Sequence, residues 1–218
     1  MTGWLHWWVA FSLTASTNLV DGGDLVTNNL ALLLLPVTLT DRRKWHWEPR
    51  RQGDGRSVLT RFFALSAVWA IRVQLAVIYF DAALGKTRVE EWVDGTALYY
   101  WLLDPMFGAP GYLVPLVRPF LLNGVTVALA TWSVMLLEWL LFAGVVMEKR
   151  YRPMLLAAGL LFHGGIGVLQ GLGSFALAMC AALILYLWPL EKEFGVVRLP
   201  AWVRGLIQKP PALGSVTR

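Results

Sequence analysis

Apolar residues in this 218-residue chain form six blocks of about 17–28 residues, and charged residues gather between them. The hydrocarbon core of a bilayer is about 30 Å thick, and a helix needs about 20 predominantly apolar residues to cross it. The pattern therefore predicts an all-α integral membrane protein, a polytopic bundle of about six transmembrane helices. We expect these helices at residues 3–20, 24–40, 58–84, 123–147, 153–170 and 172–189.

Composition supports the same class. Hydrophobic residues make up 57% of the chain and charged residues 15%, whereas a soluble domain is typically about 45–50% apolar and about 25% charged. The 12 tryptophans suit the membrane–water interface, where indole rings are enriched.

Basic residues predict the orientation. Arginine and lysine are in excess in the stretches 41–61 and 148–152, and such loops stay in the cytoplasm. Six spans then place both termini in the cytoplasm, and the loop 85–122 faces outward. Although the net charge is +5, the basic residues lie between apolar blocks, so the positive-inside rule explains them and we expect no nucleic-acid binding.

The outer loop 85–122 is long for a membrane bundle, and long ordered loops are often functional. Its prolines, which include Pro105 and Pro115, oppose one continuous helix. Residues 96–103 and 111–122 are apolar enough to form interfacial or re-entrant helix. We expect one transmembrane domain over residues 1–194 and a cytoplasmic tail over residues 195–218.

Few ionisable groups fall within the apolar blocks, where they are costly and usually paired or functional. They are Arg72 in the third block, Asp81 and Lys86 near its outer end, Glu138 in the fourth and His163 in the fifth. Arg72 and Glu138 are predicted to lie within contact distance, directly or through one side chain or water. They could then form a buried ion pair, because an isolated buried charge is far more costly than a paired one. The three histidines are isolated from one another, so no metal site is expected.

Lys86 and His163 each allow two interpretations. A lysine at a helix end can extend into the headgroups, or it can act as a base where a low-dielectric pocket disfavours its charged form. A histidine between small residues can bond a neighbouring backbone, or it can bind a quinone oxygen or shuttle a proton. Near the first outer turn, Asp21-Gly22-Gly23-Asp24 is best explained as a cap of the second helix.

Motifs in a shared order over about 170 residues resemble the horizontally transferred transmembrane (HTTM) domain superfamily, which includes vitamin K-dependent gamma-carboxylase. The first half of that order is Arg72-x-Gln74, Tyr79-Phe80-x-Ala82, Lys86 and Trp92-x-Asp94-Gly95. The second half is Glu138, Lys149-Arg150-x-Arg152, Phe162-His163 and Phe175. The chain departs from the pattern at Ala83, where glycine is usual, and at Asp81, where an apolar residue is usual.

Further motifs are most similar to the branch of sporulation-delaying protein B (SdpB). They are Thr17-Asn18-x-x-Asp21-Gly22-Gly23-Asp24, Thr40-Asp41-Arg42-Arg43 and His46-Trp47. This resemblance implies a protein of the bacterial cytoplasmic membrane that helps to mature a secreted antibacterial peptide from a toxin precursor, together with a small SdpA-like subunit. The carboxylase resemblance implies that Lys86 is a general base and that a reduced quinone is a possible cofactor.

Three functions stay open on these grounds: a processing enzyme, a non-catalytic export or assembly factor, and an immunity protein. For the enzyme, Lys86 and His163 are the expected catalytic residues, and Arg72, Gln74, Asp81, Trp92, Asp94 and Glu138 the supporting ones. We expect Lys86 to line an outward-opening cavity that reaches toward His163, with Phe80, Trp92 and Tyr99 as its apolar walls.

Overall fold

The structure, a computed structural model, describes residues 2–16, 21–41 and 57–188 of the chain. These residues form nine α-helices and no strand, which confirms the predicted all-α class. The helices are α1 (Gly3–Ser16), α2 (Gly22–Leu39), α3 (Val58–Lys86), α4 (Glu90–Val93), α5 (Ala97–Leu103), α6 (Val114–Leu121), α7 (Gly124–Ala143), α8 (Arg152–Leu169) and α9 (Gly173–Leu187). The domain boundary expected at residue 194 lies outside the described residues.

Three of the long helices begin at side-chain caps. Asp21 Oδ1 accepts the backbone N–H of Asp24 at 2.8 Å at the start of α2. Ser57 caps α3 and Asn123 caps α7 in the same way, each at 3.2 Å. A cap satisfies a backbone donor that the first turn leaves without an intrahelical partner, so these polar residues fix where the apolar helices begin.

Four helices of the described chain are long and apolar enough to cross a membrane: α2, α3, α7 and α8. At 1.5 Å per residue, the 14 residues of α1 and the 15 of α9 extend only about 21 and 22 Å, against a bilayer core of about 30 Å. The last predicted span is shorter than expected, because α9 ends at Leu187. The predicted end of the first span, residues 17–20, lies outside the described residues. These four candidate spans agree with the predicted integral membrane protein, and a six-span topology stays a prediction.

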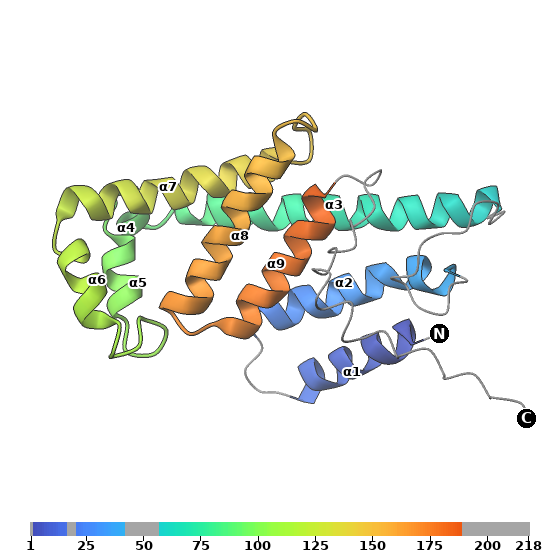
Figure 1. Cartoon of the computed structure of the whole chain (residues 1–218), viewed down its shortest axis with the longest axis horizontal. Coiled ribbons are helices and arrows are strands. Elements are labelled where there is room, and N and C mark those ends of the chain that lie inside the picture. Colours follow the sequence, from blue (N-terminus) through green and yellow to red (C-terminus); the bar gives the residue numbers. More distant parts are fainter. Residues whose placement is uncertain (1, 17–20, 42–56, 189–218) are drawn as a thin grey trace, which may run out of the picture. The chain divides into compact units, whose positions relative to one another are not determined.

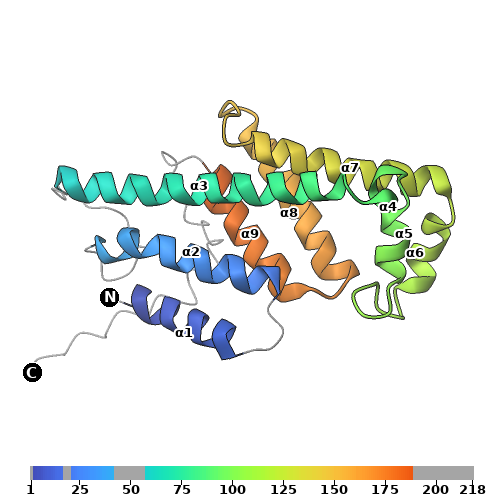
Figure 2. The same cartoon turned by 180° about the vertical axis from the view of Figure 1, so that it is seen from behind.

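Helices α3 and α7 run antiparallel to each other, and α2 packs against both α3 and α9 (Figure 1). Helices α8 and α9 lie side by side and run obliquely to α3, as both faces of the molecule show (Figure 2). The core forms where these helices meet and includes Leu30, Leu75, Leu141, Leu183 and Tyr186, all nearly inaccessible to solvent.

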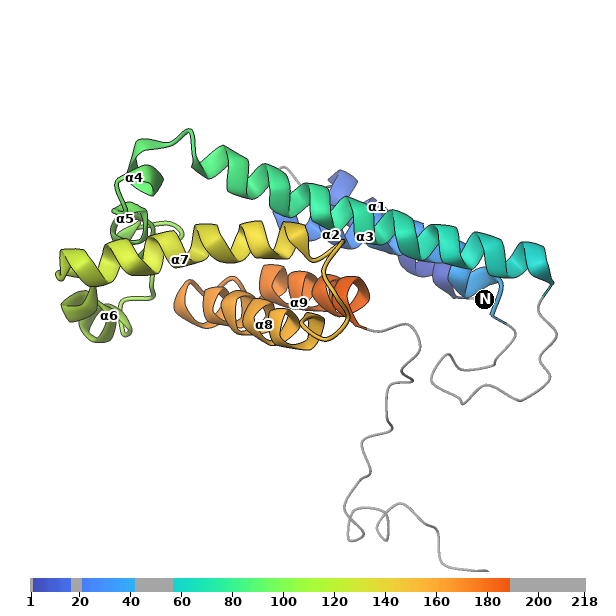
Figure 3. The ribbon, with the colours of Figure 1, turned by 90° about the horizontal axis from the view of Figure 1, so that it is seen from above.

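The predicted outer loop contains the short helices α4, α5 and α6, which pack against the first half of α7. Figure 3 shows that α7 begins well beyond the point where α3 ends and that α4 to α6 fill the space beside this overhang. Between α5 and α6, Asp104 accepts the backbone N–H groups of Phe107 and Met106, and these hydrogen bonds lower its pKa. The expected helices of this loop therefore exist, while their depth in the membrane stays a prediction.

Candidate functional site

A cavity of about 930 Å³ opens between the end of α3 and helices α2, α5, α7, α8 and α9. Its volume is near the upper end of the range of about 300–1,000 Å³ that is usual for ligand pockets. Most of its wall is apolar. Six polar side chains of the wall come from α3, α7 and α8: Gln74, Tyr79, Asp81, Lys86, Glu138 and His163.

Lys86 and Glu138 form an ion pair in this cavity. Lys86 is the last residue of α3 and Glu138 lies on α7, and the distance from Lys86 Nζ to Glu138 Oε1 is 2.8 Å. The side chain of Lys86 is 21% exposed and that of Glu138 only 6%. The lysine is therefore partly shielded and held by a buried carboxylate, and its partner is neither Asp81 nor Asp94, the two carboxylates close to it in sequence.

Trp92 covers the same lysine from α4. Lys86 Nζ lies 5.0 Å from the centroid of the Trp92 ring, within the distance at which a cation is attracted to an aromatic face. Trp92 itself is buried. The lysine thus lies between a carboxylate on α7 and an indole on α4.

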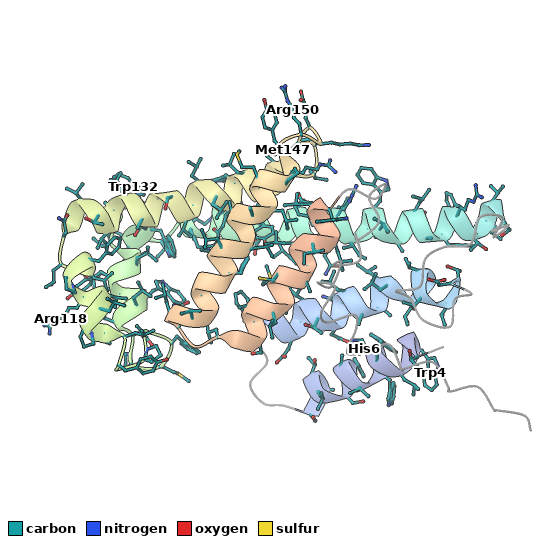
Figure 4. All side chains as sticks on the ribbon, viewed as in Figure 1. Trp4, His6, Arg118, Trp132, Met147 and Arg150 are labelled. Atoms are coloured by element: carbon teal, nitrogen blue, oxygen red, sulfur yellow. The ribbon has the colours of Figure 1, made fainter. Side chains whose placement is uncertain are left out.

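The sequence that follows Trp92 explains why α4 stays in place. Asp94 Oδ1 accepts the backbone N–H and the hydroxyl of Thr96 at 2.9 and 2.6 Å, which closes a turn. Gly95 has a φ of +86°, and a Cβ there would lie 2.8 Å from Ala128 Cβ on α7, so only glycine fits. Trp132, labelled on α7 in Figure 4, donates from Nε1 to Val93 O at 3.2 Å. Asp94 and Gly95 therefore act on the site indirectly, by fixing α4 against α7.

His163 lies across the cavity, on α8. Its Nε2 is 3.0 Å from the hydroxyl oxygen of Tyr79 on α3, and both side chains are buried. The imidazole also contacts the rings of Phe162 and Phe175. Lys86 and His163 thus line one cavity, as expected, while their chemical roles stay predictions.

The predicted pairing of Arg72 with Glu138 is wrong. Glu138 pairs with Lys86, and Arg72 donates to the backbone carbonyl of Trp188 at 3.2 Å, with its guanidinium 5.6 Å from the Trp69 ring. Arg72 lies 14 residues before Lys86, which is about 21 Å along α3, and it does not line the cavity. Its contacts are those of a residue that ties α3 to the end of α9.

Of the other predicted residues, some line the cavity and some do not. Gln74 and Asp81 line the cavity, as does Trp92, but Phe80 and Tyr99 do not. Phe80 packs against Trp139 and Phe142 of α7, because its side of α3 faces α7 and not the cavity. The prediction that Phe80 and Tyr99 form part of the cavity wall is therefore wrong. Other apolar side chains line the cavity instead, among them Leu98, Trp101 and Phe107.

Sequence reasoning missed Tyr79 as a site residue, although a signal was available. Tyr79 precedes Lys86 by seven residues, which is two helical turns, and positions four and seven apart share a face of a helix. Gln74, Ile78, Ala82 and Lys86 follow each other at four-residue steps along the same cavity-lining side of α3.

Two buried polar atoms of cavity-lining residues lack a hydrogen-bond partner within the described part of the chain: Glu138 Oε2 and His163 Nδ1. Buried polar atoms are nearly always hydrogen-bonded to protein or ordered water, so each unsatisfied one calls for an explanation. Both residues border the same cavity. This arrangement suits an occupant with an apolar body and polar atoms that complete these two groups.

Comparison with known proteins finds a matching domain family and relatives in one bacterium. The HTTM domain family matches residues 56–189. Sporulation-delaying protein SdpB of Bacillus subtilis (strain 168) is 37% identical over 192 residues, which are 88% of this chain and 59% of SdpB. The uncharacterized protein YitO of the same strain is 36% identical over 204 residues, 93% of this chain and 65% of YitO. The chain thus spans less than two thirds of the length of either relative, and no solved structure matches it significantly.

Proposed function

Because the chain belongs to the HTTM domain family and is a homologue of SdpB, we propose that it acts in the bacterial cytoplasmic membrane to mature a secreted antibacterial peptide from a toxin precursor. The observation that carries this proposal is the ion pair of Lys86 and Glu138 in a largely apolar cavity. Ionisable side chains within membrane segments are rare and mark functional sites by default. An ion pair that only held helices together would not need an open cavity of about 930 Å³ beside it.

In this proposal Lys86 is the general base. A base must be neutral when it accepts a proton, so the lysine needs a place to release its own proton. Glu138 Oε1, at 2.8 Å from Nζ, is that acceptor, and a proton can pass between them without reaching bulk water. Trp92 limits the access of water to the amine from the other side. Lys86, Glu138 and Trp92 thus form the reacting end of the cavity, and His163 with Tyr79 forms its other polar end.

The precursor peptide is the proposed substrate, and an SdpA-like subunit the proposed partner. The cavity is bordered by Trp101 and Phe107, both of which are also exposed to the surroundings. An apolar segment of the precursor can therefore enter between the α5–α6 region and the ends of α3 and α8. The SdpA-like subunit would dock on this side and complete the peptide site.

A reduced quinone is the cofactor that the carboxylase resemblance allows, and the residues present fit one. The walls are apolar, and Glu138 Oε2 and His163 Nδ1 are buried polar atoms that a ring with oxygen substituents would satisfy. Lys86, Glu138 and His163 would hold it. When bound, such a group would supply reducing electrons and an ionisable hydroxyl. A quinone-dependent, carboxylase-like reaction is therefore the second candidate function.

The proposed orientation places the cavity on the outer side of the membrane. Two spans, α3 and α7, separate the basic stretches 41–61 and 148–152 whether four or six helices cross. Both stretches therefore lie on the same side of the membrane, which their basic residues mark as the cytoplasmic side. We expect a reporter fused within 148–152, the loop that carries Arg150 in Figure 4, to read as cytoplasmic and one at Gly108 as extracytoplasmic. A cytoplasmic signal at Gly108 would overturn the orientation and the placement of the site.

Crosslinking tests whether the cavity takes the precursor. A photoreactive phenylalanine analogue at Phe107, which lines the cavity, is expected to crosslink the precursor in cells that make both proteins. The same analogue at Tyr112, which is more exposed, belongs to the same loop and lies outside the cavity lining, is the matched control. Equal crosslinking from both positions, or crosslinking from Tyr112 alone, would mean that the peptide binds elsewhere.

A further inference from the structure

Tyr79 is a buried polar residue to which neither the sequence pattern nor the proposed base chemistry gives a task. Its hydroxyl lies 3.0 Å from His163 Nε2, and both residues line the cavity. The hydroxyl belongs to α3 and the imidazole to α8, so the contact joins two helices that are far apart in sequence. What it does depends on which of the two atoms donates the proton.

The surroundings of His163 indicate a neutral ring. The aromatic rings that contact it belong to Tyr79, Phe162 and Phe175, none of which carries a negative charge. A buried imidazolium without a counter-ion would bear a large desolvation cost. A neutral imidazole has one donor nitrogen and one acceptor nitrogen, and the partner of one nitrogen decides which is which.

Two arrangements of this hydrogen bond are possible, and they leave different groups unsatisfied. If Nε2–H donated to the tyrosine, the Tyr79 O–H would need another acceptor and Nδ1 would be a buried acceptor without a donor. If the Tyr79 O–H donates to Nε2, only one donor is left over, the N–H on Nδ1, which has no partner within the described residues. The second arrangement leaves fewer buried groups unpaired and uses the imidazole nitrogen, a better acceptor than a phenol oxygen.

We infer that Tyr79 is a positioning residue that fixes His163 as the tautomer protonated on Nδ1, so that His163 serves the cavity as a hydrogen-bond donor. The complementary ligand class carries an acceptor oxygen, such as a carbonyl, where it meets His163. The two ends of the cavity then have different tasks. Lys86 and Glu138 move a proton, whereas His163 holds an oxygen atom of the ligand and does not accept a proton. This inference rests on the proposed function only in taking the cavity as the working site.

Nitrogen NMR tests the tautomer directly. In protein labelled with ¹⁵N-histidine and reconstituted in lipid nanodiscs, the ring nitrogens of His163 give separate signals for the protonated and unprotonated forms. The chain has three histidines, and the signals that H163Q removes are those of His163. We expect Nδ1 to be protonated and Nε2 unprotonated. In Tyr79→Phe the donor is lost, and the ratio of the Nδ1–H to the Nε2–H form is expected to fall about tenfold, as for the loss of one buried hydrogen bond.

Tyr186→Phe is the matched control. Tyr186 is equally buried, and its hydroxyl donates to the carbonyl of Leu141 at 2.9 Å instead of to a histidine. The same loss of a hydroxyl there should leave the tautomer ratio of His163 unchanged. A wild-type His163 protonated on Nε2, or equal ratios in the two tyrosine variants, would overturn the inference. These outcomes do not depend on toxin maturation, so they are distinguishable from a failure of the proposed function.

Discussion

Replacing Lys86 with methionine is expected to lower the free energy of unfolding by about 3 kcal/mol, because it leaves the Glu138 carboxylate buried without its partner. Breaking a buried ion pair by removing one side typically costs about 3–5 kcal/mol. The lower end applies here, since the Lys86 side chain keeps 21% of its exposure. Glu138→Leu should cost less, because it leaves behind the more exposed member of the pair.

The double variant K86M/E138L identifies the pair as the cause. Two apolar side chains of similar volume can replace a buried ion pair at little or no cost in stability. The double variant should therefore be more stable than K86M alone, and the two substitutions should be strongly coupled in a double-mutant cycle. Unfolding in mixed micelles, followed by tryptophan fluorescence, measures these differences.

An exposed ion pair of the same chain is the control for this cycle. Arg150 and Glu148 are 2.7 Å apart in the loop between α7 and α8, with side chains 68% and 67% exposed. Exposed pairs contribute about 0–1 kcal/mol, so the same cycle applied to them should show little coupling. Equal coupling in the two cycles would contradict the buried character of the Lys86–Glu138 pair.

Much of the fold could be predicted from the sequence, because the information is local. Each of the six apolar blocks contains a helix that begins within two residues of the predicted start. Apolar length and capping residues such as Asp21 and Asn123 determine these positions without reference to the rest of the molecule. The first block carries the weakest signal, because Ser12, Thr14 and Ser16 interrupt its apolar pattern.

Which charges meet could not be predicted, since this depends on how far α7 is shifted along α3. Arg72 lies 14 residues before the end of α3 and Glu138 lies 14 residues after the start of α7. A simple antiparallel hairpin would place the two opposite each other, as we predicted. The helices α4 to α6 extend α7 beyond the end of α3 (Figure 3), and the shift brings Glu138 to Lys86 instead. The register is thus set by a connecting segment whose conformation has no simple signature in the sequence.

The candidate site was predictable where the family motif carries it. Lys86 and His163 were selected as ionisable groups of the apolar blocks and again by resemblance, and the structure places both on one cavity. Their immediate partners, Glu138 and Tyr79, come from other helices and depend on tertiary packing. Asp94 was selected as well, but its contacts are those of a turn that holds Trp92 over the lysine.

Lys86→Arg is expected to abolish maturation of the toxin precursor while the protein still folds and accumulates. Arginine keeps the positive charge and can still bond the Glu138 carboxylate. K86R should therefore keep most of the stability that K86M loses. Arginine does not deprotonate in proteins, so it cannot serve as a base. This substitution therefore separates the proposed chemistry from the structural role of the ion pair. Lys149→Arg, the same exchange at an exposed position in the loop between α7 and α8, is the matched control.

Mass spectrometry of the peptide secreted by cells that make the precursor measures this most directly. With wild-type protein or with K149R, the mature peptide should be present. With K86R at equal membrane abundance, only unprocessed precursor should be found. Mature peptide at the wild-type level from K86R cells would show that Lys86 is not the base and that the ion pair serves only to hold α3 and α7 together.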